Sequence, residues 1–481
     1  MRTRPNLVYV FADQWRRSAM GCAPYADPVH TPHMDAFAAS GVLCTDAISC
    51  CPLCSPHRAA LLTGKYPFST GVFTNCKPSL PIAIRDTERT IGDILLGAGY
   101  RTGYIGKWHL DVPEERTHRF PESGARRWDA YTPPGPGRHG FQEWLSYGAW
   151  DEHLKEHYWK DTPAQIHADK WSVEYETDRA IDFLARHEND REPMCLFLSW
   201  NPPHPPYDKL PEGLLEQVPQ NIALRPNAVL TGVHNHTREA APDGAYGSAA
   251  DMRLTTRRYY AAVQGLDEQF GRLLAALQAY GYGEDTYVVL SADHGDMMGS
   301  HALIGKHVWY EESIGIPFVV AGPGVEPGRC GTVIGSPDIA PTLLGLLGVP
   351  VPDCMEGIDC AEDIRSHMAR EDKMTFIGAR PGLDCYLKEF AQAGLDPAAF
   401  GWRGVRTKKY TLVADAGYLP QKDNACGWLL YDLVHDPYAL HPQVPDMTDG
   451  EAQRLGRLLA RHLQKENDPF CTRLSKGLRE E

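Results

Sequence analysis

The sequence predicts an α/β fold in which helices sandwich a large, mostly parallel sheet and a smaller α+β domain follows. Short, nearly continuous apolar runs rich in β-branched and aromatic residues recur along the chain, which is typical of buried parallel strands. Amphipathic segments separate these runs, as expected for helices that cover a sheet. After about residue 372 the pattern changes to antiparallel strands with one exposed face. We therefore expect one domain over residues 1–372 and a second over residues 373–481.

The expected elements follow from this pattern in chain order. Buried strands are expected at Asn6–Ala12, Pro193–Trp200, Thr286–Ala292 and Ile316–Ala321. Helices are expected at Asp178–His187, Tyr259–Tyr280 and Pro337–Leu347. The Pro-, Gly- and Arg-rich stretch Val112–Gly140 is expected to be a long irregular loop, which is usually functional or mobile. In the second domain, strands are expected at Gly404–Val413 and Trp428–Leu433, with a terminal helix at Gly450–Lys465.

Composition and charge narrow the class of protein. The 481 residues are 43% hydrophobic and 23% charged, as in ordinary globular proteins. The formal net charge of −14 argues against nucleic acid as a partner, because non-specific nucleic-acid binding needs a basic surface. An anionic substrate would therefore need a locally basic pocket. The 13 cysteines lack the paired spacings of a zinc site or a disulfide scaffold, so we interpret them as mostly reduced.

The N-terminal residues do not resemble a secretory signal. Their apolar run ends after Ala12 and is flanked by charged residues, so it is too short and too charged. No stretch of about 18 apolar residues occurs, so neither a membrane-spanning helix nor a membrane partner is expected. The chain as given is expected in the cytoplasm, and a signal removed from a longer chain is the alternative.

One short stretch, CPLCSPHRAALLTG at Cys51–Gly64, places a cysteine where a helix should begin. We expect Pro56 at the first helical position, where its fixed φ suits a helix and its missing N–H costs nothing. Cys54 then lies at the helix N-terminus, where free backbone N–H groups favour negative charge or a bound oxyanion. From the residues alone, Cys54 is either a buried structural cysteine or a thiolate nucleophile.

Side chains of the types that commonly act as metal ligands follow two of the expected strands. Asp13 and Gln14 follow the first strand, and Asp293 and His294 follow the strand at Thr286–Ala292. Either pair alone would more often be an ordinary loop start. At the carboxyl edge of one sheet, however, two carboxylates, an amide oxygen and an imidazole would form an oxygen-rich site for a divalent cation.

Cationic side chains occur in three further segments that should follow strands. Lys107 and His109 lie in YIGKWHL, His204 lies in WNPPHPPY, and Lys306 lies in GSHALIGKHVWY. A single lysine or histidine in such a loop is usually just solvated. Near a metal and a helix N-terminus, the four together would form a basic cradle for a tetrahedral oxyanion.

The order of these segments resembles the type I sulfatase family of the alkaline-phosphatase superfamily. The resemblance rests on NLVYVFADQ, CSPHRAALLTGKYP, GYRTGYIGKWHL, NPPHPPY, SADHGD and IGKHVWYEE, together with HGFQEW and DIAPTLL, so it spans the chain. It implies an alkaline-phosphatase-like fold and a hydrolase of sulfate monoesters, whose substrate is a small-molecule or glycan sulfate ester.

The resemblance gives Cys54 a chemical role. In that family a separate maturation enzyme oxidises the cysteine of Cys-x-Pro-x-Arg to formylglycine (3-oxoalanine). Cys54, with Pro56 and Arg58 at the matching spacing, is the implied site, and a formylglycine-generating enzyme is an implied partner. The hydrated aldehyde keeps a second hydroxyl whose collapse expels sulfate, whereas a simple serine would be left as a sulfate ester. Cys50 and Cys51 are assigned no catalytic role.

The same resemblance implies the metal ligands. Asp13, Gln14, Asp293 and His294 are implied to bind one divalent cation, expected to be Ca²⁺, which lowers the pKa of the attacking hydroxyl. Gln14 stands where many members have a second aspartate, and His294 where many have asparagine. The Asp-Gln and Asp-His pairs resemble the choline-sulfatase and phosphonate monoester hydrolase branch, and an imidazole ligand also suits Mn²⁺ or Fe²⁺.

Catalytic roles are implied for the remaining residues. Arg58 is implied to orient the nucleophile, and Lys107 and Lys306 to hold the sulfate and offset transition-state charge. His109 is implied to deprotonate the second hydroxyl. His204 is implied to protonate the departing alcohol.

Three hypotheses for the function differ in substrate or in class. The leading one is a sulfatase acting on a sulfated carbohydrate. The second is a phosphonate monoester or phosphodiester hydrolase, or a choline- or aryl-type sulfatase. The third, a non-catalytic anion-binding protein, is disfavoured because a binder has no need of the cysteine. Trp108, Trp144 and Trp309 could stack on sugars or be core aromatics, and Arg116–Arg138 and Trp402–Arg406 are candidate subsites.

Overall fold

The computed structural model of the chain describes residues 4–235, 248–420, 426–448, 450–474 and 478. Within these residues the largest sheet has eight strands. In order across the sheet they are β13 (Gly328–Cys330), β2 (Val42–Cys44), β12 (Phe318–Ala321), β10 (Thr286–Ala292), β1 (Asn6–Ala12), β8 (Met194–Trp200), β4 (Arg101–Lys107) and β5 (Glu143–Tyr147). All four expected strands of the first domain are present, and the predicted α/β class is confirmed.

Strand β12 runs in the direction opposite to the predicted one. It pairs antiparallel with both β10 and β2, whereas the other neighbouring strands of this sheet pair parallel. The prediction that Ile316–Ala321 forms a parallel strand is therefore wrong. A continuous apolar run indicates burial on both faces of a strand, but it carries no information about direction.

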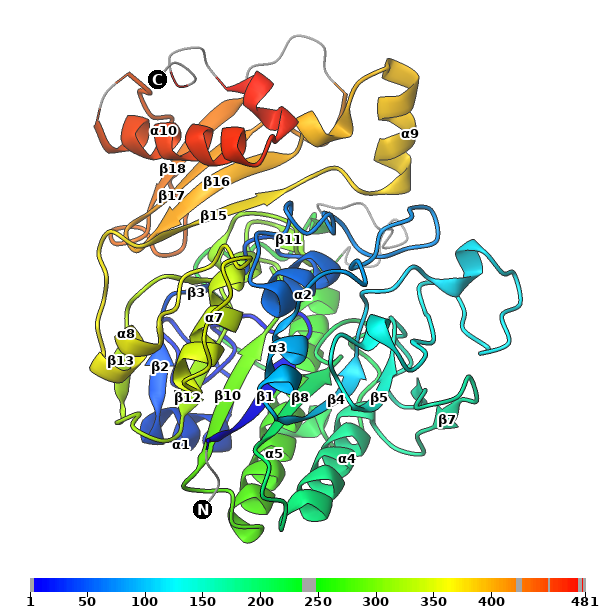
Figure 1. The fold of residues 1–481 in the computed structure, drawn as a ribbon. Coiled ribbons are helices and arrows are strands. Elements are labelled where there is room, and N and C mark those ends of the chain that lie inside the picture. The colour runs from blue at the N-terminus through cyan, green and yellow to red at the C-terminus, as the bar shows by residue number, and fades with distance from the viewer. Residues whose placement is uncertain (1–3, 236–247, 421–425, 449, 475–477, 479–481) are drawn as a thin grey trace.

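Helices cover both faces of the large sheet (Figure 1). On one face lie α2 (Cys54–Thr63), α3 (Ile91–Gly97) and α7 (Ser336–Leu346), and on the other lie α1 (Pro32–Ser40), α4 (Ser172–His187) and α5 (Ala249–Ala279). The three helices expected from amphipathic patterns correspond to α4, α5 and α7. Both α4 and α5 begin earlier than expected, and Ser248 caps α5 by accepting a hydrogen bond from the backbone N–H of Asp251.

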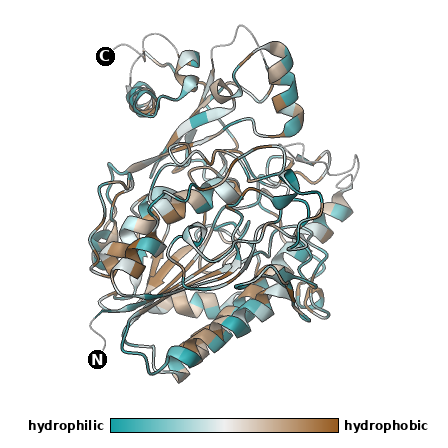
Figure 2. Ribbon diagram, turned by 45° about the vertical axis from the view of Figure 1, so that its right-hand side comes forward, coloured by the Kyte–Doolittle hydropathy of each residue, from teal (hydrophilic) through white to brown (hydrophobic). Residues whose placement is uncertain are grey.

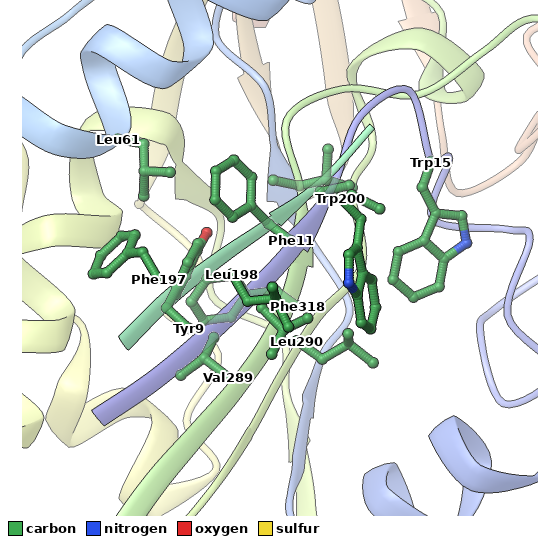
Figure 3. Close-up of a cluster of buried hydrophobic side chains, with 14 of the residues drawn as sticks. Tyr9, Phe11, Trp15, Leu61, Phe197, Leu198, Trp200, Val289, Leu290 and Phe318 are labelled. Atoms are coloured by element: carbon green, nitrogen blue, oxygen red, sulfur yellow. The ribbon is translucent and has the colours of Figure 1, made fainter. Parts of the chain in front are cut away.

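The core lies between the sheet and these helices, and its strands are apolar on both faces (Figure 2). On the side of α2, Tyr9 stacks on Phe197 with ring centroids 5.0 Å apart, and Phe11 and Leu61 lie on this same side (Figure 3). Trp200 lies on the opposite side of the sheet (Figure 3). All of these side chains are at most 1% exposed, so the central strands form a rigid base for the loops at their carboxyl ends.

A second sheet lies above the carboxyl edge of the first (Figure 1). Its four antiparallel strands are β15 (Met374–Ala379), β16 (Trp402–Thr407), β17 (Tyr410–Asp415) and β18 (Gly427–Asp432). The predicted terminal helix is present as α10 (Gly450–Lys465). It packs on this sheet, and α9 (Asp384–Ala393) stands beside the sheet. The single strand expected at Gly404–Val413 is instead parts of β16 and β17 joined by a tight turn. The domain boundary at residue 372 stays a prediction.

The remaining elements are short. The expected loop Val112–Gly140 is irregular apart from the 3-10 turns η1 (Glu114–Arg116) and η2 (Pro136–Arg138). The others are β3 (Ala47–Ile48), β6 (His157–Tyr158), β7 (Ile166–His167), η3 (Leu215–Gln217), β9 (His234–Asn235), β11 (Leu303–Ile304), α6 (Glu311–Ile314), β14 (Ile334–Gly335), α8 (Ala361–Ser366), η4 (Pro397–Ala399) and η5 (Pro469–Arg473). None of the 13 cysteines is in a disulfide bond. Among the described helices, none combines the length and apolar character needed to span a bilayer.

Candidate active site

Three of the predicted metal ligands meet at the carboxyl edge of the large sheet. Strands β1 and β10 pair in parallel with Ala12 opposite Ala292, so Asp13 and Asp293 leave the sheet side by side. The Nε2 atom of His294 lies 3.7 Å from Asp13 Oδ1 and 3.5 Å from Asp293 Oδ1. The register of one strand pair therefore assembles the cluster.

Cys54 reaches this cluster from the N-terminus of α2. Its Sγ atom lies 3.5 Å from Asp13 Oδ1, 3.4 Å from His294 Nε2 and 3.3 Å from Lys306 Nζ. Burial and Asp13 raise the pKa of the thiol, but Lys306 and Lys107 outweigh them, so the pKa lies well below its ordinary value. The position of Cys54 therefore favours an anion, as expected at a helix N-terminus.

The first turn of α2 differs slightly from the prediction. Leu53 is the cap, Cys54 is the first helical residue, and Pro56 is the third rather than the first. Proline is tolerated there because the N–H of a residue in the first helical turn has no partner within the helix. Every residue of α2 is buried, so the helix carries the charged side chain of Arg58 into the interior.

Arg58 joins the two carboxylates. Its guanidinium donates to Asp293 Oδ2 at 3.2 Å and to Asp13 Oδ2 at 3.1 Å, and also to Lys107 O and Ser199 Oγ at 2.7 Å each. The side chain is only 1% exposed, and a buried guanidinium needs partners of this kind. Because one oxygen of each carboxylate is bound by Arg58, the other oxygen of each faces His294.

The cluster fits a divalent cation. One ligand atom from each of Asp13, Cys54, Asp293 and His294 can be chosen so that all four lie within 4.8 Å of one another, and all four residues are buried. His294 Nδ1 lies 3.1 Å from the carbonyl oxygen of Gly295, so its N–H is used there and Nε2 is the acceptor nitrogen that faces Cys54 Sγ and the two carboxylates. Burial and the neighbouring carboxylate of Asp13 raise the pKa of Asp293 to about 6. A bound cation would relieve the repulsion between these two carboxylates.

Gln14, the fourth predicted ligand, is oriented by its own hydrogen bonds. Its Nε2 donates to Asp296 Oδ2 and to the hydroxyl of Tyr207, which itself donates to Asp296 Oδ2 at 2.5 Å. The amide is thereby fixed with Oε1 accepting from Lys306 Nζ at 2.7 Å. Its backbone, at φ +67°, is left-handed and also donates an N–H to Asp293 Oδ1. Strained backbone of this kind is common at functional sites.

The two predicted lysines lie on either side of Asp13. Lys107 Nζ is 2.8 Å from Asp13 Oδ2, and Lys306 Nζ is 4.0 Å from Asp13 Oδ1. Burial lowers the pKa of Lys107, but Asp13 outweighs it and raises the pKa above its ordinary value. Glycine is required at position 106, because at its φ of +102° an added Cβ would lie 2.0 Å from the carbonyl oxygen of Ser199.

His109 follows β4 in a left-handed conformation, with φ +55°. Its Nε2 lies 3.2 Å from the carbonyl oxygen of Cys76, so this nitrogen carries the proton. The buried Nδ1 is therefore the acceptor nitrogen, and the Cys54 side chain interacts with this imidazole. Burial lowers the pKa of His109, which favours its neutral form.

His204 has the opposite protonation state. Its Nδ1 lies 2.8 Å from the carbonyl oxygen of Pro205 and 3.3 Å from Asp151 Oδ1, so this nitrogen donates to them and Nε2 remains for a ligand. Burial and the two lysines lower the pKa of His204, but Asp151 and Asp13 outweigh them and raise it to about 9. The imidazole is therefore charged at neutral pH.

A cavity of about 820 Å³ opens onto Cys54, and its aromatic walls are not those expected. Trp108 and Trp144 are 0% and 2% exposed and pack on each other, so they are core aromatics. Trp309 packs on Trp402 and does not line the cavity. The tryptophans that line it are Trp128 and Trp150.

The candidate arginine subsites are only partly present. Arg403 is buried and bound to both oxygens of Asp468, and Arg406 is buried and bound to Glu311 and Asp46. The predicted subsite at Trp402–Arg406 is therefore wrong, because both of its arginines are buried and form ion pairs with carboxylates of the protein. Within Arg116–Arg138, the residue that lines the cavity with Trp128 is Arg127.

Several site residues were missed in the sequence. Asn201 accepts from Lys107 Nζ at 3.0 Å and donates to Asp151 Oδ1 at 3.1 Å. Asn201 and Tyr207 belong to the segment that drew attention to His204, and Asp296 belongs to SADHGD, so closer inspection of those motifs could have found them. Asp151 has no local signal.

Comparisons with known proteins identify the family. A family model described as sulfatase matches residues 5–349, and a model for the C-terminal part of N-sulphoglucosamine sulphohydrolase matches residues 299–468. The chain belongs to the sulfatase family. This sulfatase is 35% identical to the endo-4-O-sulfatase of Bacteroides thetaiotaomicron, over 97% of this chain and 93% of that one. It is 34% identical to the ulvan-active sulfatase of Formosa agariphila, over 91% and 76% of the two chains.

Solved structures agree. The yidJ sulfatase structure of Bacteroides fragilis superimposes with a TM-score of 0.84 at 30% identity, covering 99% of this chain and 98% of that one. The phosphonate monoester hydrolase of Agrobacterium radiobacter, at 22% identity, gives a TM-score of 0.71 over 96% and 95% of the chains and shows the shared alkaline-phosphatase-like fold. The protein is a sulfuric ester hydrolase, as the resemblance implies.

Proposed function

We propose that this sulfatase hydrolyses sulfate monoesters of a carbohydrate, with Cys54 converted to formylglycine as the nucleophile. The observation that carries the proposal is the position of Cys54 at a helix N-terminus, within 3.5 Å of Asp13, His294 and Lys306. The names of the two relatives, endo-4-O-sulfatase and ulvan-active sulfatase, support a carbohydrate substrate. A cavity of about 820 Å³ is large enough for a sugar ligand.

The residues around Cys54 have distinct proposed roles. The modified side chain supplies a hydroxyl that attacks sulfur and a second hydroxyl that permits sulfate release. Arg58, fixed by Asp13 and Asp293, orients this side chain. Lys107 and Lys306 bind the sulfate oxygens and offset the charge that develops in the transition state. A formylglycine-generating enzyme is the proposed maturation partner.

Asp13, Gln14, Asp293 and His294 would hold one divalent cation, for which we propose Ca²⁺. Such a cation polarises the sulfate and lowers the pKa of the attacking hydroxyl. Two carboxylates and an amide oxygen favour Ca²⁺, while the imidazole also suits Mn²⁺ or Fe²⁺. Elemental analysis of protein purified without added metal distinguishes these ions.

The two histidines are proposed to move protons in opposite directions. His204, protonated at neutral pH and lining the cavity, donates a proton to the leaving alcohol. His109, with its unprotonated Nδ1 in the same cavity, accepts the proton of the second hydroxyl. Pairs of groups whose environments push their pKa values apart are typical of acid and base partners.

The test is a comparison of substrates with protein matured by a co-expressed formylglycine-generating enzyme. Rates are measured on sulfated sugars, 4-nitrophenyl sulfate, a phosphonate monoester and a phosphate diester, with Cys54→Ala as the inactive control. We expect the largest kcat/KM on a sulfated sugar. A higher kcat/KM on the phosphonate monoester or the diester would contradict the proposal and favour the second hypothesis.

A further inference from the structure

The main cavity, of about 820 Å³, is lined in part by cations that the proposed chemistry does not use. Five lysine or arginine side chains line it against three carboxylates, the reverse of the balance of the whole chain, which carries a net charge of −14. Two of these lysines, Lys107 and Lys306, belong to the cluster around Cys54. Lys77 is bound by Asp384 Oδ1 at 2.7 Å. Arg127 and Arg258 are the cations that remain.

Neither of these two arginines has an anionic partner among the described residues. Arg127 is exposed, has a left-handed backbone at φ +58°, and contacts the ring of Trp150, whose centroid is 5.9 Å from the guanidinium carbon. Arg258, on α5, is half-buried at the cavity wall and forms no hydrogen bond or ion pair within the described parts of the chain. A guanidinium presents parallel N–H donors that match a carboxylate or sulfate group.

Two of the acidic residues that line the cavity already have cationic partners. Asp151 faces His204, and Glu152 Oε2 lies 3.3 Å from Lys209 Nζ. The third, Asp208, is exposed. None of these three carboxylates forms an ion pair with Arg127 or Arg258 in the described parts of the chain, so both guanidinium groups are available to a ligand.

Trp128 lies beside His109 and lines two cavities. Its ring centroid is 6.1 Å from that of His109, and the side chain is half-buried. Trp128, Lys77 and Leu383 line both the main cavity and a second one of about 370 Å³, so the two cavities adjoin. A half-buried indole in this position offers an apolar face to a sugar ring.

We propose that the substrate carries a second anionic group beside the sulfate ester, bound by Arg127 and Arg258, and that a sugar ring stacks on Trp128. This inference rests on the proposed carbohydrate sulfatase function and narrows the substrate to acidic oligosaccharides. The second anionic group is a sugar carboxylate or another sulfate, and both provide the planar or tripodal oxygens that a guanidinium binds. A neutral sulfated sugar would leave both arginines without a partner.

The experiment uses three sulfated disaccharides that differ at one position of the sugar next to the sulfated one. The first carries a uronate carboxylate, the second has that carboxyl reduced to an alcohol, and the third carries a sulfate there instead. The kcat/KM of the matured enzyme is measured for each, together with the variants Arg127→Gln and Arg258→Gln. Arg119→Gln and Arg253→Gln are matched controls, because these arginines are exposed on the same loop and the same helix but do not line the cavity.

We expect each cavity variant to lower kcat/KM about 10- to 100-fold on a disaccharide with a second charge, as charge-assisted hydrogen bonds are typically worth. On the reduced disaccharide the loss should be at least ten-fold smaller, and the control variants should leave the ratio between the substrates unchanged. Whichever charged disaccharide shows the larger loss identifies the second group as carboxylate or sulfate. Trp128→Ala should raise KM on all three disaccharides, and Trp128→Phe should largely restore it.

Equal losses on the charged and reduced disaccharides, or no loss on any of them, would overturn the inference. Failure of the proposed function itself has a different signature, namely a matured wild-type enzyme that hydrolyses none of the sulfated sugars. Calorimetric binding of the desulfated uronate disaccharide to the Cys54→Ala variant tests the arginines without turnover. Binding that is unaffected by Arg127→Gln and Arg258→Gln in that background would also overturn the inference.

Discussion

Replacing Asp151 by asparagine should move the alkaline limit of sugar-sulfate hydrolysis toward neutral pH. Burial and nearby lysines lower the pKa of His204, but Asp151, at 3.3 Å, and Asp13 raise it to about 9. Loss of an opposite charge at this distance typically shifts a pKa by about one to three units. Because 46% of the Asp151 side chain is exposed, solvent weakens the interaction, and we take about 1.5 units, which places the pKa in the variant near 7.5.

The assay is the pH dependence of kcat/KM on a sulfated sugar, whose alkoxide leaving group needs a proton. With these pKa values, the protonated fraction of His204 falls about eight-fold in the variant at pH 8.5 and less than about two-fold at pH 6.5. Glu152→Gln is the matched control, since it removes the same charge from the adjacent residue, which faces Lys209. An alkaline limit that stays near pH 9 in Asp151→Asn, or that shifts equally on 4-nitrophenyl sulfate, would refute the role of His204 as a proton donor held by Asp151.

Four further predictions concern maturation, metal, protons and stability. The peptide containing Cys54, from active protein, should carry an aldehyde that reacts with hydrazine reagents, whereas a free thiol there in fully active enzyme would contradict the mechanism. Asp293→Ala should lose both bound metal and activity, and stoichiometric metal by elemental analysis of that variant would refute the ligand assignment. His204→Ala should reduce sugar-sulfate hydrolysis about 10²- to 10⁴-fold and 4-nitrophenyl sulfate hydrolysis much less, and equal losses would indicate that it binds sulfate instead. His462 stacks on Phe376 with centroids 3.9 Å apart, and burial lowers its pKa from 6.5 to about 4. As the pH falls below 6.5, His462 is therefore protonated in the unfolded chain before it is protonated in the folded protein. The free energy of unfolding in urea should fall by about 3 kcal/mol between pH 7 and pH 4 from this group, a loss that is absent in His462→Phe.

The cluster of Asp13, Asp293 and His294 could be predicted because it depends on short-range patterns and one strand pairing. Asp13 and Asp293 directly follow apolar runs, and parallel strands in a shared sheet bring their carboxyl ends to the same edge. The direction of β12 could not be predicted in this way, because burial alone determines its apolar pattern. The exact first residue of α2 could not be predicted either, because proline is tolerated at any position of the first helical turn.

Side-chain direction and distant partners limited the prediction of the binding surface. Trp108 lies between Lys107 and His109, yet its side chain packs in the core while theirs reach the cavity, because the chain leaves β4 and turns into a left-handed conformation at His109. Arg403 pairs with Asp468, 65 residues away, which no local pattern reveals. Asp151 likewise acts on a histidine about fifty residues later in the chain. Such long-range pairings decide which charges of a sequence stay available to a ligand.

The difference between paired and unpaired cations has a consequence for catalysis. Lys107 already has Asp13 as a partner at 2.8 Å, and Lys306 has the Gln14 amide oxygen at 2.7 Å. A sulfate held by these lysines, as proposed, would therefore compete with groups of the protein. Such competition would limit the affinity for free sulfate and so favour release of the inorganic product. Arg127 has no such competitor among the described residues, and a charge held there would add affinity for the substrate but not for free sulfate. Binding energy from a group remote from sulfur would thus position the ester without retaining the inorganic product. Under this proposal, Lys107 and Lys306 act on the sulfate, whereas Arg127 and Arg258 supply affinity for the rest of the substrate.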